Sequence, residues 1–133
     1  MTGTAFDIES TAINPMNRTF LKSKIHRATV TDVALDYEGS VGIDADLMRA
    51  ADILPYELVQ VYSISNGERF ETYAVEEAAG SGTIALKGAA ARKGVRGDLI
   101  IITCYTTMDD QLAGDFKPSI VLVDQNNRVK EDR

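Results

Sequence analysis

Several residue types that many catalytic and structural sites require are scarce in this sequence. Its 133 residues include one cysteine, one histidine, three prolines and no tryptophan. A single cysteine excludes an internal disulfide, which fits a protein of the reducing cytoplasm. The single histidine, His26, excludes any metal site that needs two histidines and weakens every conventional catalytic triad. No apolar run is long enough to span a bilayer, and the first residues lack the pattern of a secretory signal, so we expect a cytoplasmic protein without membrane segments.

Acidic residues dominate the chain but are missing from one stretch of it. Lysine and arginine number 14 and aspartate and glutamate 20, which gives a net charge of −6 and disfavours nonspecific binding to nucleic acid or anionic lipid. Residues 16–31 contain no acidic residue, yet they include Arg18, Lys22, Lys24 and Arg27. This strip either attracts a small anion or forms a solvated basic edge that discourages strand aggregation.

The distribution of apolar residues predicts one mainly β domain over residues 16–133. Hydrophobic residues make up 44% of the chain, which suffices for one core. Short β-prone runs between glycine-containing turns predict about seven strands, and residues 45–51 and 108–113 predict two short helices. Such a pattern favours a closed or nearly closed β-barrel. Residues 1–15 show no clear period, and we expect them to form a mobile extension.

The dipeptide Gly39-Ser40, which lies between two β-prone runs, is the candidate reactive element. Glycine has no Cβ, so the Ser40 hydroxyl can approach the Gly39 carbonyl carbon. If the fold strains this peptide and stabilises an oxyanion, the hydroxyl can attack and shift the acyl group from nitrogen to oxygen. Elimination and hydrolysis would then leave a pyruvoyl group at residue 40. An ordinary turn explains the same residues without any chemistry.

Three further motifs cover residues 18–31, 66–73 and 88–91. In order and spacing they resemble those of the pyruvoyl-dependent aspartate α-decarboxylase family, which makes β-alanine for pantothenate synthesis, and the resemblance extends from residue 16 to near residue 127. It implies a double-psi β-barrel that assembles as a homotetramer with active sites between subunits. It also implies autocatalytic cleavage into residues 1–39 and 40–133, which in some family members requires a maturation factor.

The resemblance also implies roles for individual residues. Ser40 becomes the covalent pyruvoyl cofactor, whose ketone forms a Schiff base with L-aspartate, and Tyr73 donates a proton to Cα after carbon dioxide leaves. Its other implied site residues contact substrate or line its site, and they are Lys24, His26, Arg69, Thr72, Gly88, Ala89 and Ala90. The residues alone favour Tyr73 as a cross-strand packing residue and Arg69 as an exposed hairpin residue.

Lys87 departs from the family pattern, in which asparagine usually precedes Gly-Ala-Ala. A cation that only donates hydrogen bonds replaces a side chain that donates and accepts them. Lys87 either stabilises the cleavage oxyanion, attracts aspartate or turns outward. It also motivates the alternative that the barrel does not process itself and acts as a dicarboxylate-binding or assembly module. A second alternative is a serine hydrolase that uses Ser40 and His26, although no acidic partner is apparent.

Overall fold

The structure, a computed structural model, describes residues 16–130, so the predicted N-terminal extension lies outside the described residues. The described chain falls into two compact units. The smaller comprises residues 16–20 and 106–117, and it contains an ion pair between Arg18 and Asp110. The larger comprises residues 21–105 and 118–130 and contains all the candidate site residues. The prediction that residues 16–133 form a single domain stays a prediction.

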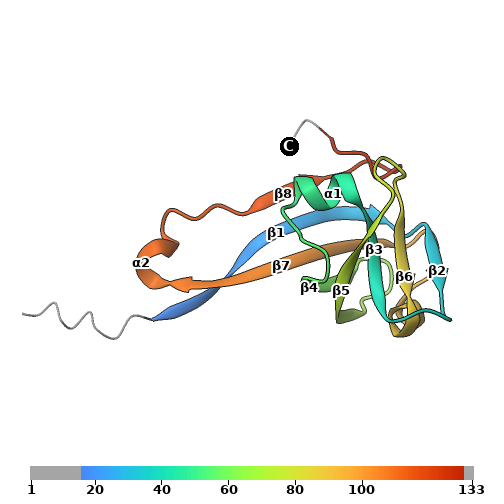
Figure 1. Ribbon diagram of the computed structural model, residues 1–133, viewed down its shortest axis with the longest axis horizontal. Helices are drawn as coiled ribbons and strands as arrows, with labels where there is room; N and C mark the ends of the chain where they lie inside the picture. The colour runs from blue at the N-terminus through green and yellow to red at the C-terminus, as the bar shows by residue number, and fades with distance from the viewer. Residues whose placement is uncertain (1–15, 131–133) are drawn as a thin grey trace, which may run out of the picture. The chain divides into compact units, whose positions relative to one another are not determined.

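The described chain forms eight strands in one sheet, with short helical segments between them (Figure 1). The strands are β1 (Asn17–Thr29), β2 (Asp32–Ala34), β3 (Ser40–Asp44), β4 (Leu58–Ser63), β5 (Arg69–Glu77), β6 (Ile84–Lys87), β7 (Leu99–Asp109) and β8 (Ser119–Leu122). The helical segments are α1 (Ala45–Ala50), the 3₁₀ helix η2 (Gly88–Lys93) and α2 (Asp110–Ala113). The predicted fold class, mainly β with short helices, is confirmed.

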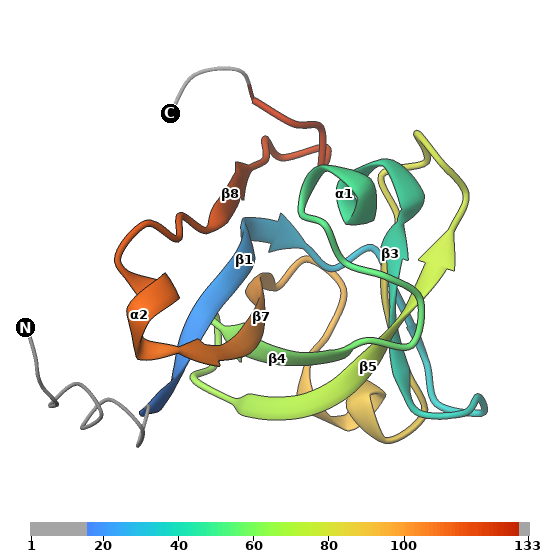
Figure 2. The same ribbon diagram turned by 60° about the vertical axis from the view of Figure 1, so that its left-hand side comes forward.

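The sheet order is β2-β6-β3-β5-β4-β7-β1-β8, so several neighbouring strands are far apart in the sequence. Strand β3 pairs parallel with β5 and antiparallel with β6, and β2 pairs parallel with β6. These four strands lie side by side in Figure 1, and Figure 2 shows α1 beyond the end of β3. The Gly39-Ser40 peptide therefore enters the sheet at the start of a strand with neighbours on both sides.

Alternation along β3 separates the core from the site. Val41 and Ile43 are fully buried in the core together with Ala74 of β5 and Leu86 of β6. Because successive side chains of a strand point to opposite faces, Ser40 and its alternate neighbours face the other side of the sheet. The core thus fixes β3, and β3 fixes the direction of the Ser40 side chain.

Both predicted helices are present but shorter than expected. Helix α1 begins after Asp44, whose side chain accepts a hydrogen bond from the Asp46 amide and so caps the helix. Helix α2 begins only at Asp110 because β7 continues to Asp109. The sequence did not predict β2 or η2. None of the helices within residues 16–130 has the length and apolar character needed to cross a bilayer.

Candidate active site

Ser40 faces a cavity of about 460 Å³ on the outer side of β3. Its side chain is 3% exposed, and its Oγ lies 3.5 Å from the carbonyl oxygen of Glu38, at the limit of a hydrogen bond. Within residues 16–130, the hydroxyl therefore has no strong partner that would hold it away from the preceding peptide. Ser40 is also the cross-strand neighbour of Lys87 on β6.

Tyr73 and Lys87 line the same cavity as Ser40, so a hydroxyl, a phenol and an ammonium group meet in one space. The register pairs Val41 with Ala74, and its extension by one residue puts Ser40 beside Tyr73. The Tyr73 ring is also packed on Tyr56, with 6.1 Å between the ring centroids. The other lining residues are Asp36, Tyr37, Glu38, Tyr56 and Val75, so Lys87 is the one basic residue that lines this cavity within residues 16–130.

Gly39 faces a second, smaller cavity of about 140 Å³. Thr72, Ala89 and Ala90 line it together with Gly39. The amide nitrogen of Ala89 lies 3.7 Å from the position that a Gly39 Cβ would occupy. The two residues of the candidate scissile bond thus face different cavities. Besides Lys87, the predicted site residues that line one cavity or the other are Gly39, Ser40, Thr72, Tyr73, Ala89 and Ala90.

Gly88 holds the loop before the scissile bond against the start of η2. It has a φ of +63°, and a Cβ there would overlap the Tyr37 carbonyl oxygen and lie 2.6 Å from the Gly39 nitrogen. Only glycine allows both this conformation and this approach. Of the two glycines beside the scissile bond, Gly88 therefore has the positive φ that close packing of this loop requires, and Gly39 does not have a positive φ.

The Lys87 ammonium does not turn outward. It lies 2.6 Å from Glu77 Oε2 and 5.3 Å from the centroid of the Tyr37 ring. Although the ion pair is close, Oε2 makes no hydrogen bond within the described residues, because the ammonium does not approach along a hydrogen-bond direction. The Lys87 and Glu77 side chains are each 22% exposed, so solvent weakens this pair only in part.

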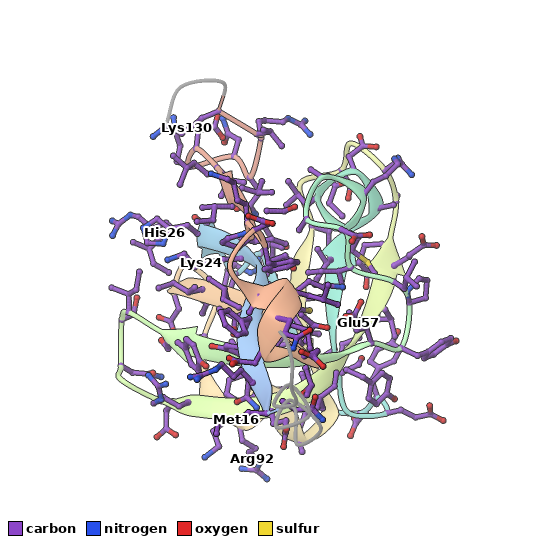
Figure 3. All side chains as sticks on the ribbon, turned by 90° about the vertical axis from the view of Figure 1, so that its left-hand side faces the viewer. Met16, Lys24, His26, Glu57, Arg92 and Lys130 are labelled. Carbon is purple, nitrogen blue, oxygen red and sulfur yellow. The ribbon has the colours of Figure 1, made fainter. Side chains whose placement is uncertain are left out.

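Lys24, His26 and Arg69 line neither of these two cavities. Strand β1, which carries Lys24 and His26, is separated from β3 in the sheet by β5, β4 and β7. Figure 3 shows Lys24 and His26 on the same side of β1, with Glu57 on the other. Burial, followed by the charges of Lys24 and Arg27, lowers the pKa of His26 below its ordinary value.

Arg69 stacks on a neighbouring ring instead of pointing into the Ser40 cavity. Its guanidinium carbon lies 3.9 Å from the centroid of the Tyr62 ring, and Tyr62 is its cross-strand neighbour. Arg69 and Tyr73 are four residues apart on β5, a separation of roughly 13 Å along a strand. Within one chain, the structure therefore does not bring Arg69 or His26 to Ser40, and the pairing of Ser40 with His26 that a serine hydrolase requires is absent from the described residues.

Sequence reasoning missed the ion pair of Glu77 with Lys87 and the close approach of the Glu77 carboxylate to Gly42. The strand pattern contained one clue, because Glu77 lies four residues after Tyr73 and must share its face of β5. The contribution of Gly42 depends on strand register, which the sequence does not display. Cys104 is fully buried, and burial raises the pKa of its thiol to about 11.

Comparison with known proteins adds independent information. The family model described as aspartate decarboxylase matches residues 16–130. The aspartate 1-decarboxylase of Syntrophus aciditrophicus is 56% identical over 115 residues, covering 86% of this chain and 99% of that protein. The aspartate 1-decarboxylase of Thermoanaerobacter pseudethanolicus is 57% identical over 113 residues, covering 85% of this chain and 97% of that protein. Among solved structures, the computationally designed protein msDPBB_sym2 covers 64% of this chain and 96% of its own, with 17% identity and a TM-score of 0.42.

Proposed function

We propose, since this chain belongs to the aspartate decarboxylase family, that it removes the carboxylate at C1 of L-aspartate to give β-alanine and carbon dioxide for pantothenate and coenzyme A synthesis. The observation that carries this proposal is the single cavity shared by Ser40, Tyr73 and Lys87. A hydroxyl that can become a ketone, a proton donor and a cation for a carboxylate are the groups that this reaction needs.

The chain first cleaves itself between Gly39 and Ser40. The Ser40 hydroxyl attacks the Gly39 carbonyl carbon, and the acyl group moves from the Ser40 nitrogen to its oxygen. Elimination then breaks the Cβ–O bond and releases residues 1–39 with a free carboxylate. Water replaces the nitrogen of the resulting dehydroalanine, releasing ammonia and leaving a pyruvoyl group on residues 40–133. The position of Ser40 Oγ beside the scissile segment, with Thr72 on the Gly39 side, supports this sequence of steps.

The residues around Ser40 fit a pyruvoyl group at this position, because the Ser40 side chain points into the larger cavity and, among the described residues, makes one long hydrogen bond. When present, that group supplies a ketone that captures the substrate amine and accepts the electron pair left by carbon dioxide. Tyr73 lines the same wall and delivers the proton that replaces the lost carboxylate. Tyr56 packs on its ring and limits the directions in which the phenol can point.

The active enzyme is a homotetramer in which a neighbouring subunit completes the site. This part of the proposal rests on Lys24, His26 and Arg69, which the resemblance assigns to the site and which line neither cavity of their own chain. Coexpression of Ser40→Ala chains with Arg69→Ala chains tests it. If Arg69 acts on the neighbour, about a quarter of the sites in a random mixture combine both intact residues and are active. If Arg69 acts within its own chain, the mixture stays inactive.

Mass spectrometry of the denatured protein tests the proposed function as a whole. We expect fragments of residues 1–39 and 40–133, the second without a free amino terminus, together with β-alanine formed from aspartate. Ser40→Ala should stay intact, and Tyr73→Phe should cleave normally yet turn over at least 100-fold more slowly, as expected when a general acid is lost. An intact wild-type chain that forms oligomers and binds dicarboxylates would instead identify a nonprocessing binding module.

Mass spectrometry of the denatured protein also tests whether chain cleavage requires a maturation factor. Cleavage of the purified chain on warming would show that it is spontaneous. Cleavage only after addition of a cytoplasmic extract from a cell that expresses the protein would show that a maturation factor is required. The cytoplasm is the compartment that we propose, since the single cysteine is a buried free thiol.

A further inference from the structure

Three neighbouring strands bring Glu77, Gly42 and Lys87 to one face of the sheet. In the register, Glu77 of β5 pairs with Asp44 of β3, and Lys87 of β6 pairs with Ser40 of β3. Gly42 lies between Ser40 and Asp44 on the same face, because side chains alternate along the strand. A side chain at position 77 must therefore cross β3 to reach Lys87.

Gly42 provides the space for that crossing. A Cβ at position 42 would lie 2.8 Å from Glu77 Cδ and 2.9 Å from Glu77 Cγ, and it would overlap Oε2. The carboxylate of Glu77 thus occupies the volume that any other residue at position 42 would fill. Because Gly42 has no side chain, the Glu77 carboxylate can lie at a fixed position as the counterion of the Lys87 ammonium.

The contact with Glu77 leaves most of the binding capacity of Lys87 free. An ammonium group has three N–H donors, and Glu77 Oε2, at 2.6 Å, occupies at most one of them. Lys87 lines the Ser40 cavity and also a neighbouring cavity of about 280 Å³, which Glu77 lines as well. Glu77 therefore meets the ammonium on the side of the neighbouring cavity, and the donors that it leaves free remain available to a ligand in the Ser40 cavity.

The charges around the cavity make such a cation necessary for an anionic substrate. Asp36 and Glu38 also line the cavity, and both repel carboxylates. Aspartate has two carboxylates with different fates. The one at C1 leaves as neutral carbon dioxide, but the side-chain carboxylate stays ionised from binding to product release and needs a cation throughout.

We propose that Lys87 determines substrate specificity by binding the side-chain carboxylate of aspartate, and that Glu77, lying in the space left by Gly42, is the positioning residue that fixes the Lys87 ammonium. This inference rests on the proposed function for the identity of the substrate. It adds Lys87 to the residues that the resemblance assigns to the substrate site, among them Arg69 and Lys24.

Binding of succinate to uncleaved protein tests the role of Lys87 without requiring turnover. Succinate has both carboxylates of aspartate and no amine. In a Ser40→Ala background, we expect Lys87→Gln to weaken succinate binding about tenfold by calorimetry, the effect of losing one partly exposed charged hydrogen bond. Lys130→Gln, which removes an equal charge from a residue that lines neither cavity, should leave the affinity unchanged. Equal affinities for the Lys87→Gln protein and its parent would overturn the proposal.

Steady-state kinetics, normalised to the amount of cleaved chain, test the positioning role of Glu77. We expect Glu77→Gln and Gly42→Ala each to raise KM for aspartate about fivefold with little change in kcat, an effect of the size found within charge networks. In a Lys87→Gln background, neither change should alter KM further, because the group that they position is gone.

Two results would contradict this role of Glu77. A lower KM in Glu77→Gln would mean that Glu77 competes with substrate for Lys87, and an equal rise in KM without Lys87 would mean that its effect is merely structural. A wild-type protein that neither cleaves nor forms β-alanine would refute the proposed function instead. The succinate measurement would still decide whether Lys87 binds a dicarboxylate.

Discussion

Gly88→Ala should slow chain cleavage strongly while leaving the protein folded. The substitution has two costs that can be separated. A non-glycine residue at the observed φ of +63° costs about 1–3 kcal/mol. The new Cβ would also overlap the Tyr37 carbonyl oxygen and approach within 2.7 Å of Gly39 Cα, and overpacking of this kind costs about 1–3 kcal/mol more.

The second cost acts directly on the candidate scissile segment. To admit the Cβ, residues 37–39 must move away from η2, which shifts the Gly39 carbonyl relative to Ser40 Oγ. A displacement near 1 Å between reacting groups can slow a reaction about 100-fold, and we expect a loss of cleavage rate of that order. The fold itself should survive, since Gly88 is buried but contributes no side chain to the hydrophobic core.

Gly67→Ala is the matched control for this experiment. Gly67 has a φ of +78°, but no atom of the described residues lies within 4 Å of its missing Cβ, so only the conformational cost applies. The assay is the half-time of cleavage by intact mass for both variants, with stability measured by urea unfolding in a Ser40→Ala background so that all chains stay uncut. If Gly88→Ala cleaves as fast as Gly67→Ala, the close approach of Gly88 to the scissile segment has no role in processing.

Two further predictions concern buried polar groups. Asn127→Ala should lower the free energy of unfolding, measured by urea titration, by about 2–4 kcal/mol, because it leaves backbone groups of Thr29 and Gly82 without their hydrogen-bond partners. As a control, Asn126→Ala, at an exposed position, should change this free energy by less than about 0.5 kcal/mol. Burial alone would raise the pKa of Asp44, but three backbone amides, with that of Gly82 the strongest, outweigh it and lower the pKa below 3.8. The stability that ionised Asp44 contributes is therefore fully present above about pH 4 and is lost as the pH falls through the lowered pKa. Asp44→Asn should accordingly reduce the fall of the unfolding free energy with decreasing pH. An unchanged fall would refute this role of Asp44.

Alternation and turn residues were sufficient to predict the strands that flank the site. The run that became β4, the turn at Gly67 and the return strand β5 follow from local sequence, because the turn needs a positive φ and the flanking residues alternate. Strand β2 was missed because its three residues, Asp32–Ala34, are too few to show a period. It exists only because it pairs with β6, which is about fifty residues further along the chain.

Local sequence likewise predicts some parts of the candidate site, whereas other parts depend on the pairing of distant strands. Gly39, Ser40 and the residues after Gly88 were identified from motifs, and the structure brings them together. The contact between Glu77 and Lys87 depends on two registers at once, parallel between β3 and β5 and antiparallel between β3 and β6. Neither register is visible in the sequence, because both pair strands that are not consecutive in the chain. Asn127 is 1% exposed because its side chain bonds to Thr29 and Gly82, which are far from it in the sequence.

The alternation of β3 also explains how one peptide bond can serve two reactions. In the proposed mechanism, the Gly39 carbonyl is attacked during cleavage, and residue 40 becomes the electrophile during turnover. Successive residues of a strand face opposite sides, so the wall beside Gly39, with Thr72 and Ala89, differs from the wall beside Ser40, with Tyr73. Each wall can then be suited to its own reaction, because a side chain that assists cleavage does not occupy the space that the substrate needs.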